Sequence, residues 1–287
     1  MRFQWPEKTA NHVAKYSISA ILGNMDDTRA AIAEQIQTIT AKLLATQPVG
    51  YRLFLIGGFR YRLLDASCRS SIDLDYHWEG DLDGKQAEIV EVLCKRLLPE
   101  VQQRIGYEGT IRRASGADAD SPAVRIVEMA FYRPAVYGSR IEIPLEITHI
   151  SRFDPPQVRT AAGVVFLTVS DADMIESKVL ALLNRVFTQA RDILDIFLFQ
   201  DRLPLDARER LTQKFTDLGL SPEDVTTRLE KLRVARAVHV RELERILDTQ
   251  VAPPVAANLR LAGGATVIWD QVLARLIDLL VIQEQQP

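Results

Sequence analysis

The chain has 287 residues, of which 47% are hydrophobic and 25% are charged, and its formal net charge is −3. This composition is typical of a globular protein with one large or two smaller domains, and it excludes disordered and fibrous classes. The slightly negative charge argues against a protein that coats nucleic acid without specificity. No apolar run approaches the roughly 18 residues of a membrane span, and charges scattered through residues 1–20 predict that no secretory signal is present. With two cysteines a disulfide framework is excluded, which favours a reducing, cytoplasmic location.

The first part of the chain is predicted to mix helices and strands. Apolar residues at helical spacing indicate helices over residues 26–47 and 85–104. The short apolar run 51–58 predicts a buried strand that ends in a turn at Gly57 and Gly58. Alternating or short apolar patterns predict further strands over residues 71–78, 107–113, 124–132, 139–148 and 164–170.

After Ser170 the pattern becomes helical. A Ser/Asp cap predicts one long helix from residue 171 to 199, and a second cap at Ser221 begins a long helix over residues 221–247. A final amphipathic helix is predicted after two glycines at 263–264. We therefore predict an α/β (α+β) fold, with a mixed sheet and flanking helices in a domain of residues 1–169 and a helical domain of residues 170–287.

The segment 57–78 carries the sharpest chemical pattern. Glycines at 57 and 58 leave the backbone open to a ligand, and the N–H groups of such a turn can bind phosphate oxygens. Asp73 and Asp75 lie two positions apart on the predicted strand, which places both carboxylates on one face. Proteins bind Mg²⁺ with one or two carboxylates plus substrate phosphates. The segment therefore predicts a site for Mg²⁺ or Mn²⁺, although an Asp-x-Asp pair alone is also typical of a solvated strand face.

A third acid is expected on the predicted strand 139–148. Glu142 and Glu146 share one face of that strand, and either would complete a set of metal ligands. We prefer Glu146 because its neighbours Leu145 and Ile147 make the more apolar context. The alternative is an exposed edge strand, because Pro144 lacks the N–H that an interior strand donates.

The predicted helix after Ser170 carries Lys178, Arg185 and Asp192 at intervals of seven residues, which places them along one stripe. One interpretation is a pair of cations that binds a nucleoside triphosphate, with Asp192 and Asp195 orienting them or assisting proton transfer. The alternative is a solvated helical face with stabilising ion pairs. The six Lys and Arg residues of segment 228–245 leave a similar choice between ion-paired helix surface and an RNA-binding face.

Four blocks in this order, GG, RSSIDLD, LEIT and ESKVLALLNRVFTQARDILDIF, resemble the AbiEii/AbiGii-type nucleotidyltransferases, which are toxins of bacterial toxin–antitoxin and phage-defence systems. The resemblance covers about residues 50–200. The sequence differs from the family where Phe59 and Arg60 follow the glycine pair in place of Thr or Ser. The positions that match the family's motifs are Gly57, Gly58, Arg69, Ser71, Asp73, Asp75, Glu146, Lys178, Arg185, Arg191, Asp192 and Asp195.

The resemblance implies a nucleotidyltransferase-type sheet and a helical C-terminal part that contributes to the active-site cleft. An acceptor hydroxyl would attack the α-phosphate of a nucleoside triphosphate (NTP) and release pyrophosphate. The implied roles are metal binding by Asp73, Asp75 and Glu146, phosphate contact by Gly57, Gly58, Arg69 and Ser71, charge neutralisation by Lys178 and Arg185, and support by Asp192 and Asp195.

We therefore expect a Mg²⁺-dependent nucleotidyltransferase toxin that modifies RNA, tRNA in particular, and has a cognate antitoxin. A second hypothesis is transfer to a small molecule or a protein, which steeply salt-dependent affinity for tRNA would argue against. A third is a non-catalytic nucleotide-binding or scaffold module, for which Asp73→Asn would leave turnover and growth unchanged.

Overall fold

A computed structural model describes residues 25–82, 84–114, 124–134, 136, 138–185 and 187–280 of the chain. It divides into two compact units, the first made of Met1–His149 and Pro156–Thr168 and the second of Ile150–Pro155 and Val169–Pro287. The segment Ile150–Pro155, which the predicted division assigns to the first domain, thus clusters with the helical unit.

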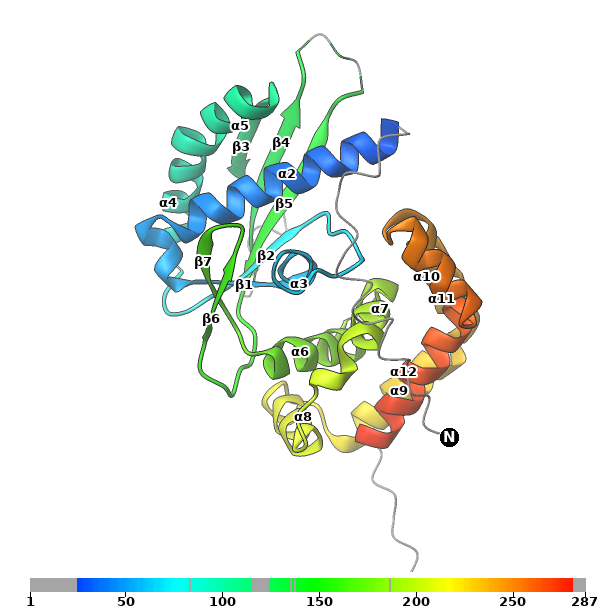
Figure 1. The fold of residues 1–287 in the computed structure, drawn as a ribbon. Coiled ribbons are helices and arrows are strands. Elements are labelled where there is room, and N and C mark those ends of the chain that lie inside the picture. Colours follow the sequence, from blue (N-terminus) through cyan, green and yellow to red (C-terminus); the bar gives the residue numbers. More distant parts are fainter. Residues whose placement is uncertain are drawn as a thin grey trace, which may run out of the picture. The chain divides into compact units, whose positions relative to one another are not determined.

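The first unit is built on a seven-stranded mixed sheet with the order β3-β4-β5-β2-β1-β7-β6 (Figure 1). The pairs β2–β5 and β1–β7 are parallel, and the other neighbours are antiparallel. The predicted strands are confirmed, but β6 was missed. The strands are β1 (Leu53–Ile56), β2 (Leu74–Trp78), β3 (Glu108–Arg113), β4 (Val124–Tyr132), β5 (Ile141–Thr148), β6 (Gln157–Ala161) and β7 (Val164–Thr168).

Helices cover the core face of this sheet, where α2 runs across the strands in Figure 1. The hydrophobic core joins Ile36 and Leu44 of α2 and Leu93 of the second helical segment to the strand residues Leu55 and Leu145. The predicted helices 26–47 and 85–104 are confirmed, the second with a π-helical turn at its centre. The elements are α2 (Met25–Ala45), the 3₁₀ turn η2 (Pro48–Arg52), α3 (Gly57–Asp65), α4 (Lys85–Val92), the π-turn η3 (Leu93–Leu97) and α5 (Leu98–Ile105).

Strand β5 lies in the interior of the sheet, between β4 and β2, so the alternative of an exposed edge strand is wrong. Its residues alternate between faces: Ile143, Leu145 and Ile147 are buried in the core, whereas Glu146 is half-buried on the opposite face. Pro144 pairs with Glu128 of β4 in the register, but it lies beyond the first residue of β2. The proline is therefore tolerated because β2 begins one position later, opposite Leu145.

The second unit is helical, but the two long helices predicted for it are each broken in two. Arg185 has an extended backbone (φ −70°, ψ 146°) that ends α6, and Ala235 separates α9 from α10. Neither break contains Gly or Pro, and the apolar periodicity continues on both sides, so the pattern gave no sign of them. The helices are α6 (Asp171–Asn184), α7 (Ala190–Phe199), η4 (Gln200–Arg202), α8 (Ala207–Asp217), α9 (Pro222–Val234), α10 (Arg236–Thr249), α11 (Pro253–Leu261) and α12 (Gly264–Leu280).

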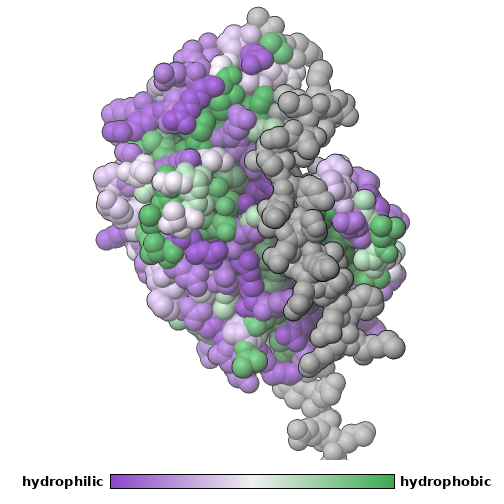
Figure 2. Space-filling view, in the orientation of Figure 1, coloured by the Kyte–Doolittle hydropathy of each residue, from purple (hydrophilic) through white to green (hydrophobic). Residues whose placement is uncertain are grey.

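Hydrophobic residues also reach the surface of the first unit. Figure 2 shows pale and green atoms in the region of β6 and β7, where Val158 and Val165 are exposed. These strands form a hairpin whose two-residue turn, Ala162–Gly163, has positive φ at both positions, as the twist of paired strands favours. Within the described part of the chain, no helix has both the length and the apolar character to cross a membrane.

Candidate functional site

Asp75 and Glu146 lie beside each other on neighbouring strands. In the parallel pairing of β2 with β5, Asp75 is in register with Glu146. Leu74 and Tyr76 point into the core, so the alternation of the strand places Asp75 on the other face, where it is half-buried. Side chains in register on adjacent parallel strands share a face. The sheet therefore brings the two carboxylates together.

Glu142, the other acid considered on this strand, is placed differently. Its partner in the sheet is Ala130 of β4, and it precedes the residues of β5 that pair with β2. Its side chain is exposed and forms an ion pair with Arg140, with 2.7 Å between Nε and Oε1. Of the two acids, Glu146 is thus the neighbour of Asp75.

Gly57 begins a helix that packs directly against Asp75. The predicted turn at Gly57 and Gly58 is wrong, because both residues belong to the first turn of α3. Gly57 has φ +74°, and a Cβ at this position would lie 1.8 Å from Oδ2 of Asp75. The N-cap residue of this helix is Ile56, whose side chain has no group that could accept a hydrogen bond from the helix. The first N–H groups of a helix attract anions, so Asp75 lies next to a backbone that favours phosphate.

The loop before β2 brings three more predicted residues to the same helix start. A Cβ at Gly58 would lie 2.4 Å from Nη2 of Arg69 and 2.8 Å from Oγ of Ser71. Ser71 donates a hydrogen bond of 2.7 Å from Oγ to Oδ1 of Asp73. Asp73 is buried and precedes β2, so the strand predicted from residue 71 begins later than expected, and Ser71 rather than strand alternation orients the Asp73 carboxylate.

Gln37 of α2 fixes this loop and was not predicted. Its side-chain Nε2 donates to the backbone carbonyls of Ser71 and Asp73 at 3.0 and 3.3 Å. Gln37 is buried among the apolar residues of α2. A polar residue in the apolar stripe of a helix was the sequence signal that pointed to it, since a buried amide needs partners.

The residues present suit a divalent metal in their chemistry. No group of three or more His, Cys, Asp or Glu side chains arranged to hold a metal ion is found among the described residues. The in-register pair Asp75–Glu146 supplies two carboxylates, the hard oxygen donors with which Mg²⁺ is held when substrate phosphates provide further ligands. The donor set therefore fits Mg²⁺ or Mn²⁺ bound together with a nucleotide.

Phe59 and Arg60, which depart from the family pattern, have structural roles. Phe59 belongs to the hydrophobic core, and Arg60 is fully buried in an ion pair with Asp65, with 2.5 Å between Nη1 and Oδ2. Arg60 Nε also donates to Oγ1 of Thr168, which in turn donates to the carbonyl of Leu55. These contacts connect α3 to β1 and β7. Phe59 and Arg60 are thus both buried, and the backbone at Gly57 is the part of α3 that lies against Asp75.

The second unit holds the predicted cations in a cluster of charges. Lys178 of α6 pairs with two buried carboxylates of α7, at 2.9 Å from Nζ to Oδ1 of Asp192 and 3.0 Å to Oδ2 of Asp195. Arg185 pairs with Asp192 at 2.8 Å and keeps 42% of its side chain exposed. The predicted stripe along one helix is wrong, because the acids and Lys178 lie on two helices that pack together. The ion pairs fit the expected orienting role of Asp192 and Asp195. Of the two predicted cations, Arg185 is more accessible than Lys178, whose side chain is 12% exposed.

The basic segment 228–245 is partly neutralised by ion pairs. Arg233 pairs with Glu230 on α9, and Arg236 of α10 pairs with Asp270 of α12. Arg241 and Arg245 are exposed one helical turn apart on α10. Arg233 and Arg236 therefore fit an ion-paired helix surface, whereas Arg241 and Arg245 are accessible to an RNA backbone.

Comparison with known proteins assigns the family. Residues 41–259 match the family described as "Nucleotidyl transferase AbiEii toxin, Type IV TA system". The chain belongs to this family. It is therefore a nucleotidyltransferase of the AbiEii toxin family, whose members are the toxins of toxin–antitoxin systems, as the sequence motifs predicted.

Two solved structures are similar to this chain at low sequence identity. MenT4, a nucleotidyltransferase toxin from Mycobacterium tuberculosis, is 17% identical over 97% of this AbiEii-family chain and 90% of its own, with a TM-score of 0.53. JHP933 from Helicobacter pylori is 18% identical over 87% of this chain and 94% of its own, with a TM-score of 0.48. No protein with a curated description matches the sequence. The likeness to MenT4 confirms the predicted α/β fold with a nucleotidyltransferase-like sheet.

Gly57→Ala is expected to abolish most of the nucleotidyltransferase activity, because the new methyl group must displace the Asp75 carboxylate. The positive φ adds about 1–2 kcal/mol of strain. Gly163→Ala is the matched control: Gly163 has a similar φ of +78°, but a Cβ there meets nothing within 4 Å. Thermal unfolding should show the cost of the positive φ in both variants and a further loss from the contact with Asp75 in Gly57→Ala, whereas turnover should fall only in Gly57→Ala. Equal turnover in both would contradict a role for this contact.

Proposed function

We propose that this AbiEii-family nucleotidyltransferase transfers a nucleoside monophosphate from an NTP to an RNA acceptor in a Mg²⁺-dependent reaction. The observation that carries the proposal is the in-register pair Asp75–Glu146 beside the start of α3, where Gly57 leaves room for the Asp75 carboxylate. Carboxylates can hold a divalent cation, and the first N–H groups of a helix favour phosphate oxygens, so a surface that carries both can accept a metal-bound nucleotide.

The residues of the first unit would divide the work as follows. Asp75 and Glu146 would hold the metal, with Asp73 as a further ligand that Ser71 orients through its hydrogen bond. The backbone at Gly57 and Gly58 would bind phosphate oxygens, and Arg69, whose guanidinium lies against Gly58, would add positive charge there. Phosphoryl transfer depends chiefly on positioning and on charge neutralisation, and these residues would supply both.

When bound, Mg²⁺ would neutralise phosphate charge and lower the barrier for attack by an acceptor hydroxyl on the α-phosphate. Glu146 would accept the hydrogen bond of that hydroxyl and so align it. The bond that forms joins the acceptor oxygen to the α-phosphorus, and the bond that breaks joins the α-phosphorus to the oxygen bridging to the β-phosphate. Pyrophosphate leaves with that oxygen, and the hydroxyl proton passes to the Glu146 carboxylate. In the second unit, Lys178 and Arg185 would bind phosphate oxygens, with Asp192 and Asp195 holding them in place.

Arg185→Ala is expected to raise the KM for NTP about tenfold or more, since a charge-assisted hydrogen bond to phosphate contributes about 1.5–3 kcal/mol. Stability should change little, because a partly exposed ion pair contributes about 0–1 kcal/mol. Steady-state kinetics with the NTP varied would measure the effect. Arg233→Ala, which removes another exposed, ion-paired arginine on α9, is the control. An unchanged KM in Arg185→Ala would remove this residue from the phosphate site.

An RNA acceptor, tRNA in particular, is supported by exposed cations on the helical unit. Arg241 and Arg245 lie on one face of α10, and Lys231 is exposed on α9. Such side chains bind phosphates along a nucleic-acid backbone, with an affinity that falls steeply as salt rises. A cognate antitoxin follows from membership of a toxin–antitoxin family. A cytoplasmic location is supported by the two cysteines, which form no disulfide.

Label transfer tests the proposal. The protein would be incubated with Mg²⁺, each α-labelled NTP in turn, and total bacterial tRNA. Label in tRNA that depends on Mg²⁺ and rises at low salt is the expected result. Label in added protein or in a small molecule, with pyrophosphate released, would show that the acceptor is that molecule and not RNA. Absence of both transfer and pyrophosphate, with intact folding, would contradict the proposed reaction.

A further inference from the structure

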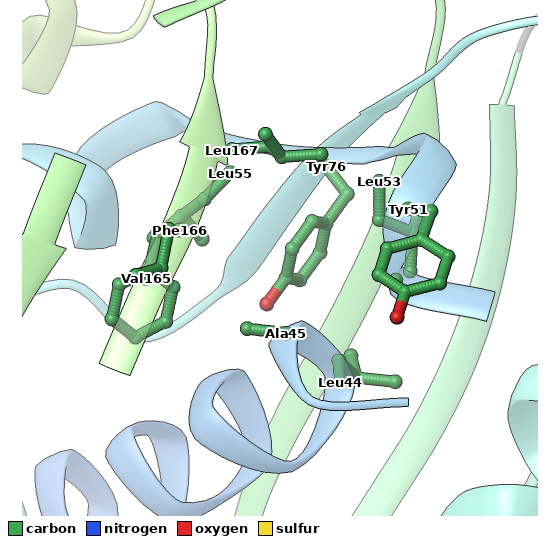
Figure 3. Close-up of a pocket in the computed structure, with 10 residues that line it drawn as sticks. Leu44, Ala45, Tyr51, Leu53, Leu55, Tyr76, Val165, Phe166 and Leu167 are labelled. Carbon is green, nitrogen blue, oxygen red and sulfur yellow. The ribbon is translucent and has the colours of Figure 1, made fainter. Parts of the chain in front are cut away.

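A cavity of about 190 Å³ lies in the first unit, on the face of the sheet opposite to Asp75 and Glu146 (Figure 3). Its walls come from the end of α2 and from β1 and β7, with Leu44, Leu55 and Phe166 among the lining residues. All the residues that line it are uncharged. An apolar cavity of similar size, about 150 Å³, is large enough to bind a molecule such as benzene.

The Tyr76 hydroxyl points into this cavity. Tyr76 is 3% exposed, and its hydroxyl has no hydrogen-bond partner among the described residues. Figure 3 shows the oxygen directed into the space beside Ala45, with Phe166 on one side and Tyr51 on the other. A tyrosine hydroxyl can both donate and accept a hydrogen bond. A buried donor without a partner is unfavourable, and a ligand that supplies an acceptor would relieve it.

We propose that this cavity is a binding site for a small uncharged molecule with one ring and a single hydrogen-bonding group, of which phenol is the simplest example. Apolar walls match the ring, and the Tyr76 oxygen, which lacks a partner among the described residues, matches the polar group. A charged ligand is disfavoured, because the lining residues carry no opposite charge to offset its desolvation.

The site is separate from the proposed nucleotide site but shares a strand with it. Tyr76 follows Asp75 directly in β2, and its side chain points to the opposite face. Tyr51, at the mouth of the cavity, is 73% exposed and so leaves an approach from solvent.

Titration of phenol and of toluene tests this inference in the full chain. Thermal unfolding and isothermal titration calorimetry would be measured for the native sequence, for Tyr76→Phe and for Ala45→Leu. Toluene matches phenol in size and lacks the hydroxyl. We expect saturable phenol binding that is about three- to tenfold tighter than toluene binding, the factor that one hydrogen bond contributes.

Tyr76→Phe should lose the preference for phenol and bind toluene at least as tightly, because the phenol hydroxyl would then be buried without a partner. This variant should fold as well as the native chain, since the hydroxyl it removes has no partner. Ala45→Leu should weaken both ligands by filling the space beside the hydroxyl. Absence of saturable binding would overturn the inference, as would an unchanged preference for phenol in Tyr76→Phe. A crystal soaked in phenol that holds only water at Tyr76 would do the same.

Discussion

Asp75→Asn is expected to lower kcat about 10²- to 10³-fold, the range seen when one electrostatic contact to the reacting phosphate is lost. The amide keeps the size of the carboxylate, so the contact with Gly57 is preserved and only the charge changes. Glu146→Gln should give a similar loss, because Glu146 is the in-register neighbour of Asp75. The measurement is pyrophosphate release under saturating NTP and Mg²⁺.

Glu142→Gln is the matched control for this experiment. Glu142 lies on the same strand as Glu146 but is exposed and paired with Arg140, away from β2. Its replacement should leave kcat within twofold of the native value. If Glu142→Gln were as damaging as Glu146→Gln, or if Asp75→Asn kept full turnover with normal unfolding behaviour, the assignment of the site to this pair of strands would be wrong.

Lys214→Met is expected to destabilise the second unit by about 3–5 kcal/mol, as is typical when one partner of a buried ion pair is removed. Lys214 is fully buried, and its Nζ lies 2.7 Å from Oδ1 of Asp173 and 2.7 Å from Oε2 of Glu176. Both carboxylates are also fully buried. Methionine fills the space of the lysine stem but leaves the two negative charges with Arg210 as their remaining cation of this cluster. Urea denaturation, followed by circular dichroism, measures the loss.

Arg210 links this cluster to the segment Ile150–Pro155. Its guanidinium contacts Asp154, Asp173 and Glu176, and hydrogen bonds to it hold the pKa of Asp154 below the usual range. Because the folded state lowers this pKa, the contribution of the Asp154 carboxylate to folding stability is complete above the unfolded value of 3.8 and is lost as pH falls through the folded value.

Lys231→Met, at an exposed site on α9, is the control for Lys214→Met and should change stability by less than about 0.5 kcal/mol. Equal urea midpoints for Lys214→Met and Lys231→Met would contradict a stabilising role for the buried ion pairs of Lys214.

The strands could be predicted from the sequence because buried and less buried residues alternate along them. Alternation in β5 sets Ile143 and Leu145 on the core face and leaves Glu146 on the other. The same patterns could not give the order of the strands, which depends on contacts between distant segments. Pro144 therefore suggested an edge strand, although β5 lies next to β2 and ends up carrying the acid that neighbours Asp75.

Some helix boundaries could not be predicted from local patterns. Glycines at 57 and 58 suggested a turn, but the backbone of Gly57 at φ +74° lets α3 start directly after β1. The predicted helix ends at Arg185 although no Gly or Pro is present there. Packing of α7 on α6 offsets the free energy of the helical hydrogen bonds that are lost. The position of Gln37 among apolar residues of α2 marks it as a buried amide, but its partner, the loop at Ser71, depends on tertiary structure and could not be predicted.

The central claim, that Asp75 and Glu146 hold the metal that binds the nucleotide, is tested most directly by locating Mn²⁺. Crystals grown with Mn²⁺ and a non-hydrolysable NTP analogue would be measured at the manganese absorption edge. We expect an anomalous peak within coordination distance of carboxylate oxygens of both Asp75 and Glu146, with phosphate oxygens as further ligands. A nucleotide bound with the manganese peak elsewhere, or with no metal at these two side chains, would contradict the central claim.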